Sequence, residues 1–170
     1  VASHLALPRC GVPDAPAVFG LMGKPVCRWN HGPVRWWFRF AVGGLDQSQV
    51  AAAFRWALDR WARDCGFRWI EDRRRPNVLA HTGRIDGPGR VLAWSHLPCG
   101  VGEHSELEQR YDVGENYLAA GRDYFRAVVL HEIGHALGLE HSQDQRSIMY
   151  PIMRPNVLDL GGDDVPRIRA

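Results

Sequence analysis

The stretch from His131 to His141, which reads HEIGHALGLEH, holds three histidines at spacings that suit a single metal ion. Side chains at positions i and i+4 of a helix share a face, so His131 and His135 can present two imidazole nitrogens to the same ion. Gly138 tolerates left-handed backbone dihedrals and lets the chain turn out of the helix, which brings His141 back toward that ion. Three neutral nitrogen ligands with an open fourth position are typical of a catalytic zinc rather than a closed structural one.

Glu132 lies beside the first histidine but points away from the ligand face, which favours a base over a fourth ligand. A catalytic zinc lowers the pKa of its water to about 7, and Glu132 can then take the proton as that water attacks a carbonyl. The alternative is a helix with three incidental histidines. Five specified residues at fixed spacing arise by chance in on the order of one in 10⁵ chains of ordinary composition, so the functional interpretation is favoured.

The composition indicates one folded domain. The chain has 170 residues and a mass of 19.2 kDa, with 45% hydrophobic and 24% charged residues, which is ordinary for a globular protein and too short for two full domains. Its formal net charge of +2 disfavours an electrostatic nucleic-acid binder, and we interpret Arg73–Arg75 as a solvated turn. No apolar run approaches the roughly 20 residues that span a bilayer. We therefore expect neither a nucleic-acid nor a membrane partner.

Hydrophobic periodicity predicts a chain of mixed α+β type. Val34–Val42 alternates apolar and polar side chains, which predicts a half-buried strand. Asp46, followed by Gln49 three residues later, predicts a helix start with a capping box. A second long helix is predicted over Asp123–Gly138, capped by Asp123. Further short strands are expected at 67–71, 78–81, 91–95 and 110–113, and a last short helix near 163.

The zinc motif and the residues after it resemble the matrixin branch of the metzincin zinc endopeptidases, as in matrix metalloproteinases. Ser142, directly after the third histidine, is the matrixin version of the metzincin signature. Met149 follows eight residues after His141, which matches the family's Met-turn, and would form an apolar floor under the zinc ligands. The resemblance covers nearly the whole chain and implies a secreted, monomeric endopeptidase acting on proteins or peptides. Its fold would be a twisted mixed five-stranded sheet with about three helices.

The segment Pro8–Asp14, which reads PRCGVPD, matches the family's cysteine-switch motif at all seven positions. By this resemblance, residues 1–18 form an inhibitory arm and residues 19–170 the catalytic domain. Cys10 would place its thiolate at the open zinc position and displace the catalytic water. Activation would follow a cut near Ala17–Phe19.

The pairing of the four cysteines stays open at this point. They stand at positions 10, 27, 65 and 99. Cys10 on zinc leaves three cysteines for pairing, so the alternative is that Cys10 forms half of a disulfide. In the switch motif, Arg9 is expected to pair with Asp14 and hold the arm in shape.

The resemblance also implies where a substrate lies. Val91–Ala93 would be the edge strand that pairs with an extended peptide through Leu92 and Ala93, with Ala93 close to the scissile bond. The apolar S1′ pocket would lie between the catalytic helix and Pro151–Met153. Met153 stands where the family usually has tyrosine, and its flexible side chain implies a more adaptable pocket wall.

The family has two further kinds of metal site, and the sequence retains the carboxylates of the first but not the ligands of the second. Asp86, Asp112 and Glu115 resemble the carboxylates of a calcium-binding loop, and oxygen ligands are what calcium prefers. The second, structural zinc common in the family is expected to be absent, because its four ligand positions are held by Leu79, His81, Trp94 and Arg110. One ligand cannot hold a zinc that takes four. A displaced site from the histidines at 81, 96 and 104 is the alternative, and surface histidines are preferred.

Two other interpretations compete with a matrixin endopeptidase. A zinc-binding scaffold that captures peptides without cleaving them belongs to a different function class, and Glu132 argues against it because an inactive relative commonly loses that base. Another metzincin branch, such as the astacins, would have a different residue at Ser142. A nucleic-acid-binding module is the weakest alternative because of the charge balance.

Overall fold

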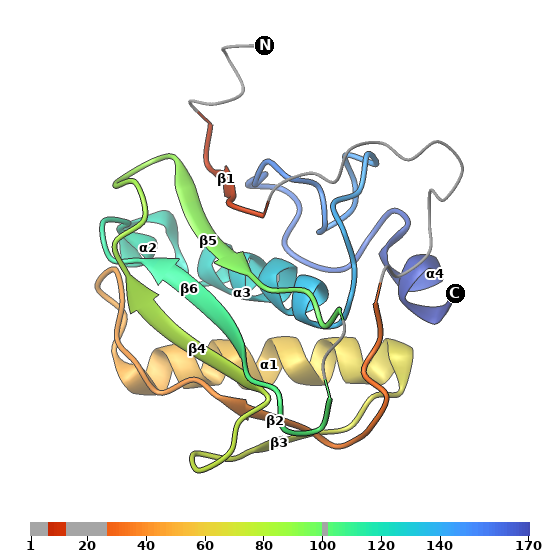
Figure 1. Cartoon of the computed structure of the whole chain (residues 1–170). Coiled ribbons are helices and arrows are strands. Elements are labelled where there is room, and N and C mark those ends of the chain that lie inside the picture. Colours follow the sequence, from red (N-terminus) through yellow and green to blue (C-terminus); the bar gives the residue numbers. More distant parts are fainter. Residues whose placement is uncertain (1–6, 13–26, 100–101) are drawn as a thin grey trace.

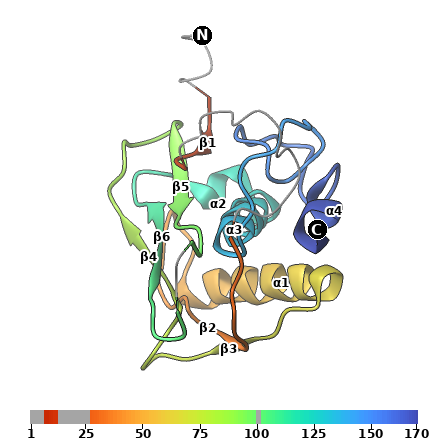
Figure 2. The same cartoon turned by 45° about the vertical axis from the view of Figure 1, so that its right-hand side comes forward.

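The fold is a mixed β-sheet with its two long helices packed against one face (Figures 1 and 2). The computed structural model describes residues 7–12, 27–99 and 102–170. The strands are β1 (Arg9–Cys10), β2 (Val34–Trp37), β3 (Trp69–Glu71), β4 (Val78–Gly83), β5 (Val91–Ser95) and β6 (Leu107–Asp112). The helices are α1 (Gln47–Cys65), α2 (Tyr117–Ala120), α3 (Arg122–Ala136) and α4 (Asp164–Arg169).

The strand order across the sheet is β1-β5-β6-β4-β2-β3. β5 runs antiparallel to β6, and the other paired strands run parallel. This arrangement confirms the predicted mixed α+β class. The sheet of the described residues has six strands rather than the predicted five, because the amino-terminal arm adds β1 at the outer edge of β5.

Helix α1 begins where its sequence predicts. The Asp46 side chain accepts hydrogen bonds from the backbone N–H groups of Ser48 and Gln49, at 2.8 and 2.9 Å. The Gln49 side chain accepts one from the backbone N–H of Asp46, which completes the capping box. Gly66, at φ 72°, ends the helix in the left-handed conformation that glycine adopts readily.

The capping box of α1 gives a stability prediction. Asp46→Ala removes an acceptor for two otherwise unsatisfied N–H groups, and we expect the free energy of unfolding to fall by about 1 kcal/mol. Urea denaturation followed by circular dichroism would measure the change. Gln47→Ala, at an exposed neighbouring position outside the box, is the matched control and should leave stability nearly unchanged. Equal stability of the two variants would contradict this role for Asp46.

The second long helix differs from its prediction at the start. α3 begins at Arg122, directly after Gly121, and no side chain caps it. The prediction that Asp123 is the cap is wrong, because the short helix α2 precedes α3 and the chain passes from one helix to the next through Gly121. Asp123 lies in the first turn of α3 instead, where a carboxylate interacts favourably with the helix dipole.

The first predicted strand is shorter than its alternation implies. β2 ends at Trp37, although Phe38 and Phe40 continue to alternate into the core. β2 pairs with β3 only as far as Trp36 and with β4 only at Trp36 and Trp37. Residues 38–41 therefore keep the periodicity of a strand, but they pair with no strand among the described residues.

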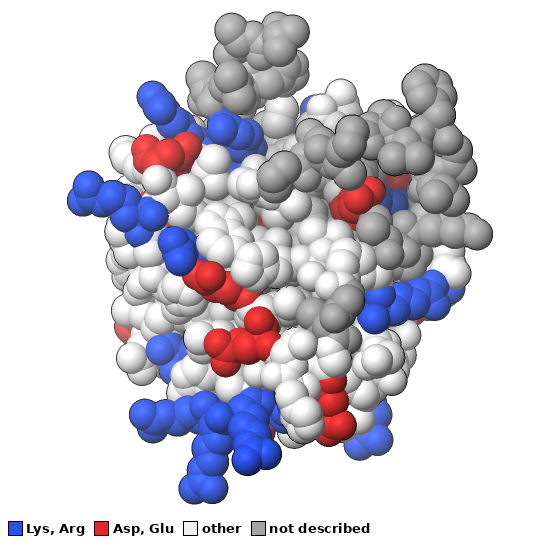
Figure 3. Space-filling model, in the orientation of Figure 1, with Lys and Arg blue, Asp and Glu red and all other residues white. Residues whose placement is uncertain are grey.

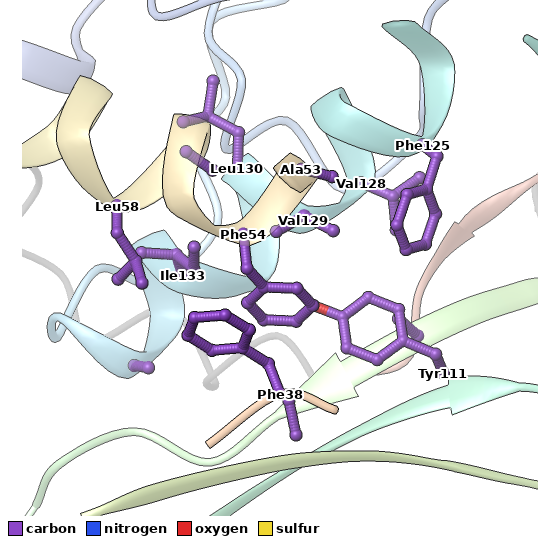
Figure 4. Packing of buried hydrophobic residues seen from close by; sticks show 14 of the residues in the cluster. Phe38, Ala53, Phe54, Leu58, Tyr111, Phe125, Val128, Val129, Leu130 and Ile133 are labelled. Carbon is purple, nitrogen blue, oxygen red and sulfur yellow. The ribbon is translucent and has the colours of Figure 1, made fainter. Parts of the chain in front are cut away.

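The core fills the space between the sheet and the helices α1 and α3 (Figure 4). Phe38 and Phe54 stack with ring centroids 4.9 Å apart, and Tyr111 meets the edge of Phe54 at 5.6 Å. The Trp61 indole N–H of α1 donates to the carbonyl oxygen of Leu130 in α3, at 2.9 Å. These contacts hold α3, the helix that carries His131 and His135, against both α1 and the sheet.

The cysteine pairing that the sequence leaves open is visible in the structure. Cys27 and Cys99 form a disulfide, with their Cα atoms 4.9 Å apart. Cys10 and Cys65 lie outside this bond. The alternative of a disulfide at Cys10 is therefore not the arrangement found here.

The molecular surface carries both signs of charge (Figure 3). Arg73–Arg75 form an exposed turn, and the Asp72 carboxylate accepts the backbone N–H groups of Arg74 and Arg75. Within the described ranges, the structure contains no helix long and apolar enough to cross a membrane.

Candidate metal centre

The three motif histidines meet at one point. His131 and His135 project from the same face of α3, with their Nε2 atoms 3.1 Å apart. The His141 ring lies 5.3 Å from that of His131 and 4.8 Å from that of His135, centroid to centroid. With the Cys10 Sγ, their ligand atoms all lie within 4.8 Å of one another.

The turn that returns the chain to this point depends on Gly138, which has a φ of 107°. The N–H of Gly138 donates to the carbonyl oxygen of His135 at 2.8 Å, and the N–H of Leu139 donates to that of Gly134 at 3.0 Å. These bonds satisfy carbonyls that the end of a helix otherwise leaves unpaired. A Cβ at Gly138 would collide with the carbonyl oxygen of Cys27. Glycine is thus required by both the dihedral and the space.

Hydrogen bonds orient the two helical histidines. The Nδ1–H of His131 donates to the carbonyl oxygen of Ile148 at 2.6 Å, and that of His135 donates to Leu139 at 2.7 Å. Both Nε2 atoms are therefore left with lone pairs. Burial lowers the pKa of His131 to about 3, and burial also holds that of His135 well below its ordinary value. Neutral imidazoles of this kind are the form that binds metals.

Glu132 is buried next to the histidines, with 1% of its surface exposed. Its Oε2 has no hydrogen-bond partner among the described residues. Burial raises the pKa of this carboxyl to about 8, while a hydrogen bond with Cys10 acts in the opposite direction. A carboxylic acid with such a pKa can accept and return a proton near neutral pH.

Gln109 is a positioning contact that sequence reasoning missed. It is fully buried on β6, and its Nε2–H₂ donates to the carbonyl oxygen of Glu132 at 2.9 Å and to the Ser95 hydroxyl at 3.1 Å. Gln109 thereby links the sheet to the backbone of the motif helix. A polar residue between the apolar Leu107 and Tyr111, at an inward position of a strand, was the signal available in the sequence.

Met149 lies fully buried against α3. A Cβ at Gly134 would collide with its sulfur, so the glycine between the two helical histidines lets the methionine approach. The Met149 N–H donates to the Ser147 hydroxyl at 2.9 Å. Asp164 in α4 accepts from the N–H of Ile148 at 2.8 Å and from the Ser147 hydroxyl, which holds this turn in place.

The arm segment lies across the open side of the centre. The Cys10 Sγ is 3.4 Å from the Nε2 of His135. The N–H of Gly11 donates to the carbonyl oxygen of Ala93 at 2.8 Å, and that of Cys10 donates to Pro151 at 3.0 Å. The N–H of Met153 donates in turn to Pro8 at 3.0 Å. Residues 8–11 thus occupy the space between β5 and residues 151–153.

Several predictions about the arm concern residues outside the described ranges. Pro13, Asp14 and the cut near Ala17–Phe19 lie outside the described residues, so the expected Arg9–Asp14 pair stays a prediction. The buried Leu92 and Ala93, and the buried Met153, lie on either side of the arm. The structure therefore brings the predicted substrate-binding residues together around Cys10.

A family model described as matrixin matches residues 28–170. This chain belongs to the matrixin family. Relatives include the hatching enzyme of Paracentrotus lividus, 30% identical over 99% of the chain, and metalloendoproteinase 1 of Glycine max, 28% identical over 98%. The macrophage metalloelastase of Oryctolagus cuniculus is 30% identical over 96%. The matches cover 30%, 63% and 37% of these proteins, so the chain spans less than two thirds of their length.

Two of the carboxylates that resemble those of a matrixin calcium loop accept hydrogen bonds from backbone N–H groups. Asp112 accepts from Asp86, Gly87 and Gly114 at 2.8–3.0 Å, and Glu115 accepts from Gly89 at 2.6 Å. Among the described residues, three or more potential metal-ligand side chains converge at Cys10 and the three histidines. The carboxylates of Asp86, Asp112 and Glu115 do not form such a group. Calcium binding by this matrixin stays a prediction.

Three of the four positions that correspond to ligands of a second zinc in matrixins are His81, Trp94 and Arg110, and their side chains contact other residues here. The Arg110 guanidinium lies 5.2 Å from the Trp94 ring centroid and 2.6 Å from the Glu108 carboxylate. The His81 Nε2 lies 2.7 Å from the same carboxylate. Arg110 and His81 together hold the pKa of Glu108 below its usual value, against the effect of burial. The His81 ring is thus paired with the Glu108 carboxylate of the neighbouring strand.

Proposed function

We propose that this matrixin is a secreted zinc-dependent endopeptidase whose amino-terminal arm keeps it latent. The observation that carries the proposal is the convergence of His131, His135 and His141, with the buried Glu132 beside them. The names of several relatives, including a metalloendoproteinase and a metalloelastase, agree with peptide-bond hydrolysis. The Cys27–Cys99 disulfide supports an oxidising compartment, because such bonds persist mainly in secreted proteins.

The donor set fits zinc. Three neutral imidazole nitrogens converge, two of them oriented by hydrogen bonds to backbone carbonyls, and this is the ligand type of catalytic zinc sites. His131, His135 and His141 would hold the ion. When bound there, zinc supplies a Lewis acid that polarises the scissile carbonyl and lowers the pKa of a water.

Glu132 acts as the general base in this proposal. Its carboxylate takes a proton from the water that attacks the peptide carbonyl, and the resulting acid returns the proton to the leaving amine nitrogen. The raised pKa of Glu132 supports this role because the group can hold a proton near neutral pH. Gln109, bonded to the Glu132 carbonyl oxygen, keeps the helix backbone in register with the sheet.

A substrate peptide would take the place of the arm. The carbonyl oxygens of Ala93 and Pro151 already accept N–H groups from an extended segment, Cys10–Gly11. This pairing supports β5 and residues 151–153 as the two walls of the substrate cleft. It also supports latency, since an arm bonded to both walls excludes a peptide while Cys10 lies at the metal ligands.

Metal analysis and peptide hydrolysis test the proposal. The arm-free protein should cleave a fluorogenic peptide, stop when a chelator removes the metal, and recover with added zinc. Elemental analysis should give one zinc per chain. Stoichiometric zinc without cleavage would favour the peptide-capturing scaffold, and two zincs per chain would contradict the expected lack of a second site. The calcium prediction at Asp86, Asp112 and Glu115 has its own test. Added calcium should raise the melting temperature of the parent, and this rise should be lost in Asp112→Asn.

A further inference from the structure

The segment Cys27–Trp29 packs against the turn that leads from α3 to the third histidine. The Cys27 carbonyl oxygen lies so close to Gly138 that a Cβ there would collide with it. The Trp29 indole N–H donates to the carbonyl oxygen of Ala136 at 2.8 Å. Both contacts fall within five residues of His141, although the two segments are separated by more than a hundred residues of sequence.

These contacts stabilise the end of the motif helix from outside. Ala136 is the last residue of α3, and carbonyls in the last turn of a helix have no donor within the helix. Trp29 supplies that donor to Ala136. Its half-buried ring also meets His31 edge-on, with centroids 5.5 Å apart, which limits its freedom to move away.

A covalent bond holds this segment in place. The Cys27–Cys99 disulfide joins it to the connection that follows β5. On its other side, the turn is held by bonds from the Ser142 N–H to Met149, at 2.8 Å, and from Arg167 to the Glu140 carbonyl oxygen, at 2.9 Å. His141 therefore lies on a turn that is restrained from two directions.

We infer that the disulfide-anchored segment Cys27–Trp29 is a positioning element for the third metal ligand. It rests on the proposed zinc centre and adds a specific device for retaining the ion. The helix fixes His131 and His135 relative to each other, but only the path after Gly138 determines where the His141 nitrogen lies. Restricting that path before the metal arrives lowers the ordering cost of binding, and contacts outside the ligand shell commonly change metal affinity by about 10- to 100-fold.

The test is the zinc dissociation constant of the full chain, measured by competition with a chromophoric chelator. The double variant Cys27→Ser and Cys99→Ser should bind zinc roughly 10- to 100-fold more weakly. Trp29→Phe, which keeps an aromatic side chain but removes the indole N–H, should shift the constant in the same direction by less. Cys65→Ser is the matched control, because it removes a thiol outside the disulfide, and should bind as the parent does.

A second control separates positioning from general loss of stability. Leu58→Ala truncates a buried side chain of α1, which should destabilise the fold by about 2–5 kcal/mol without touching the segment. Hydrogen exchange of the amides at 139–142 in the metal-free proteins gives a readout apart from zinc. It should be faster in the disulfide and Trp29 variants and unchanged in Leu58→Ala.

The outcomes distinguish this inference from the proposed function. If the parent chain binds no zinc, the proposed function fails. If the parent binds zinc but the disulfide and Trp29 variants match it within twofold, the positioning inference alone is wrong. An equal loss of affinity in Leu58→Ala would also overturn it, because general destabilisation would then account for the effect.

Discussion

Glu132→Ala should lower peptide hydrolysis by the arm-free protein by roughly 10²–10⁴-fold while leaving one zinc bound. The substitution removes the buried carboxylate beside the histidines, and the ligand set of three histidines stays intact. The loss should fall on kcat, because Glu132 handles the proton rather than the peptide backbone. Steady-state kinetics with a fluorogenic peptide and elemental analysis of the same samples would measure both quantities.

Two further variants sharpen this experiment. Glu132→Gln keeps the size of the side chain but cannot accept the proton, so it should lose as much activity as the alanine variant. Glu140→Ala removes a neighbouring carboxylate on the turn and should leave hydrolysis close to that of the parent. Full activity in either Glu132 variant would rule out its assignment as the general base.

Cys10→Ser should increase the activity of the uncut chain by roughly 10- to 100-fold. We take the contact of the thiolate with the metal to stabilise the closed arm by at least as much as a charged hydrogen bond, about 1.5–3 kcal/mol, and each 1.4 kcal/mol is a factor of ten in the open fraction. The backbone bonds of the arm to Ala93 and Pro151 remain in the variant. Peptide hydrolysis by the uncut chain gives the direct measurement.

Cys65→Ser is the control for the latency experiment, since Cys65 lies outside the disulfide and away from the histidines. It should be as latent as the parent. Equal latency of the parent and Cys10→Ser would remove the thiol from the mechanism. Any remaining latency would then come from the strand pairing of the arm alone.

Local physics made the convergence of the three motif histidines predictable from the sequence. The i and i+4 spacing of His131 and His135 defines a shared helix face, and Gly138 marks the turn that returns His141. The capping box at Asp46 is similarly a four-residue signal, and the structure confirms it. Such features depend on neighbours along the chain, so no knowledge of the tertiary fold was needed.

Contacts between distant segments were harder to predict. Cys27 and Cys99 are 72 residues apart, and periodicity says nothing about which cysteine meets which. Gln109 contacts the Glu132 carbonyl oxygen only because β6 lies beneath α3. The start of α3 was misplaced for a related reason, because the adjoining short helix α2, rather than a capping side chain, leads the chain into it.

The arm strand β1 has a consequence for the behaviour of the protein in concentrated solution. It covers the outer side of β5, with the N–H groups of Arg9 and Gly11 donating to the carbonyl oxygens of Arg90 and Ala93 at 2.8 Å. Without the arm, these acceptors would border an apolar edge, Val91–Ala93, open to pairing with the same edge of another molecule. Removing the arm would therefore expose a surface for self-association, and the arm would contribute to colloidal solubility in addition to its proposed role in latency.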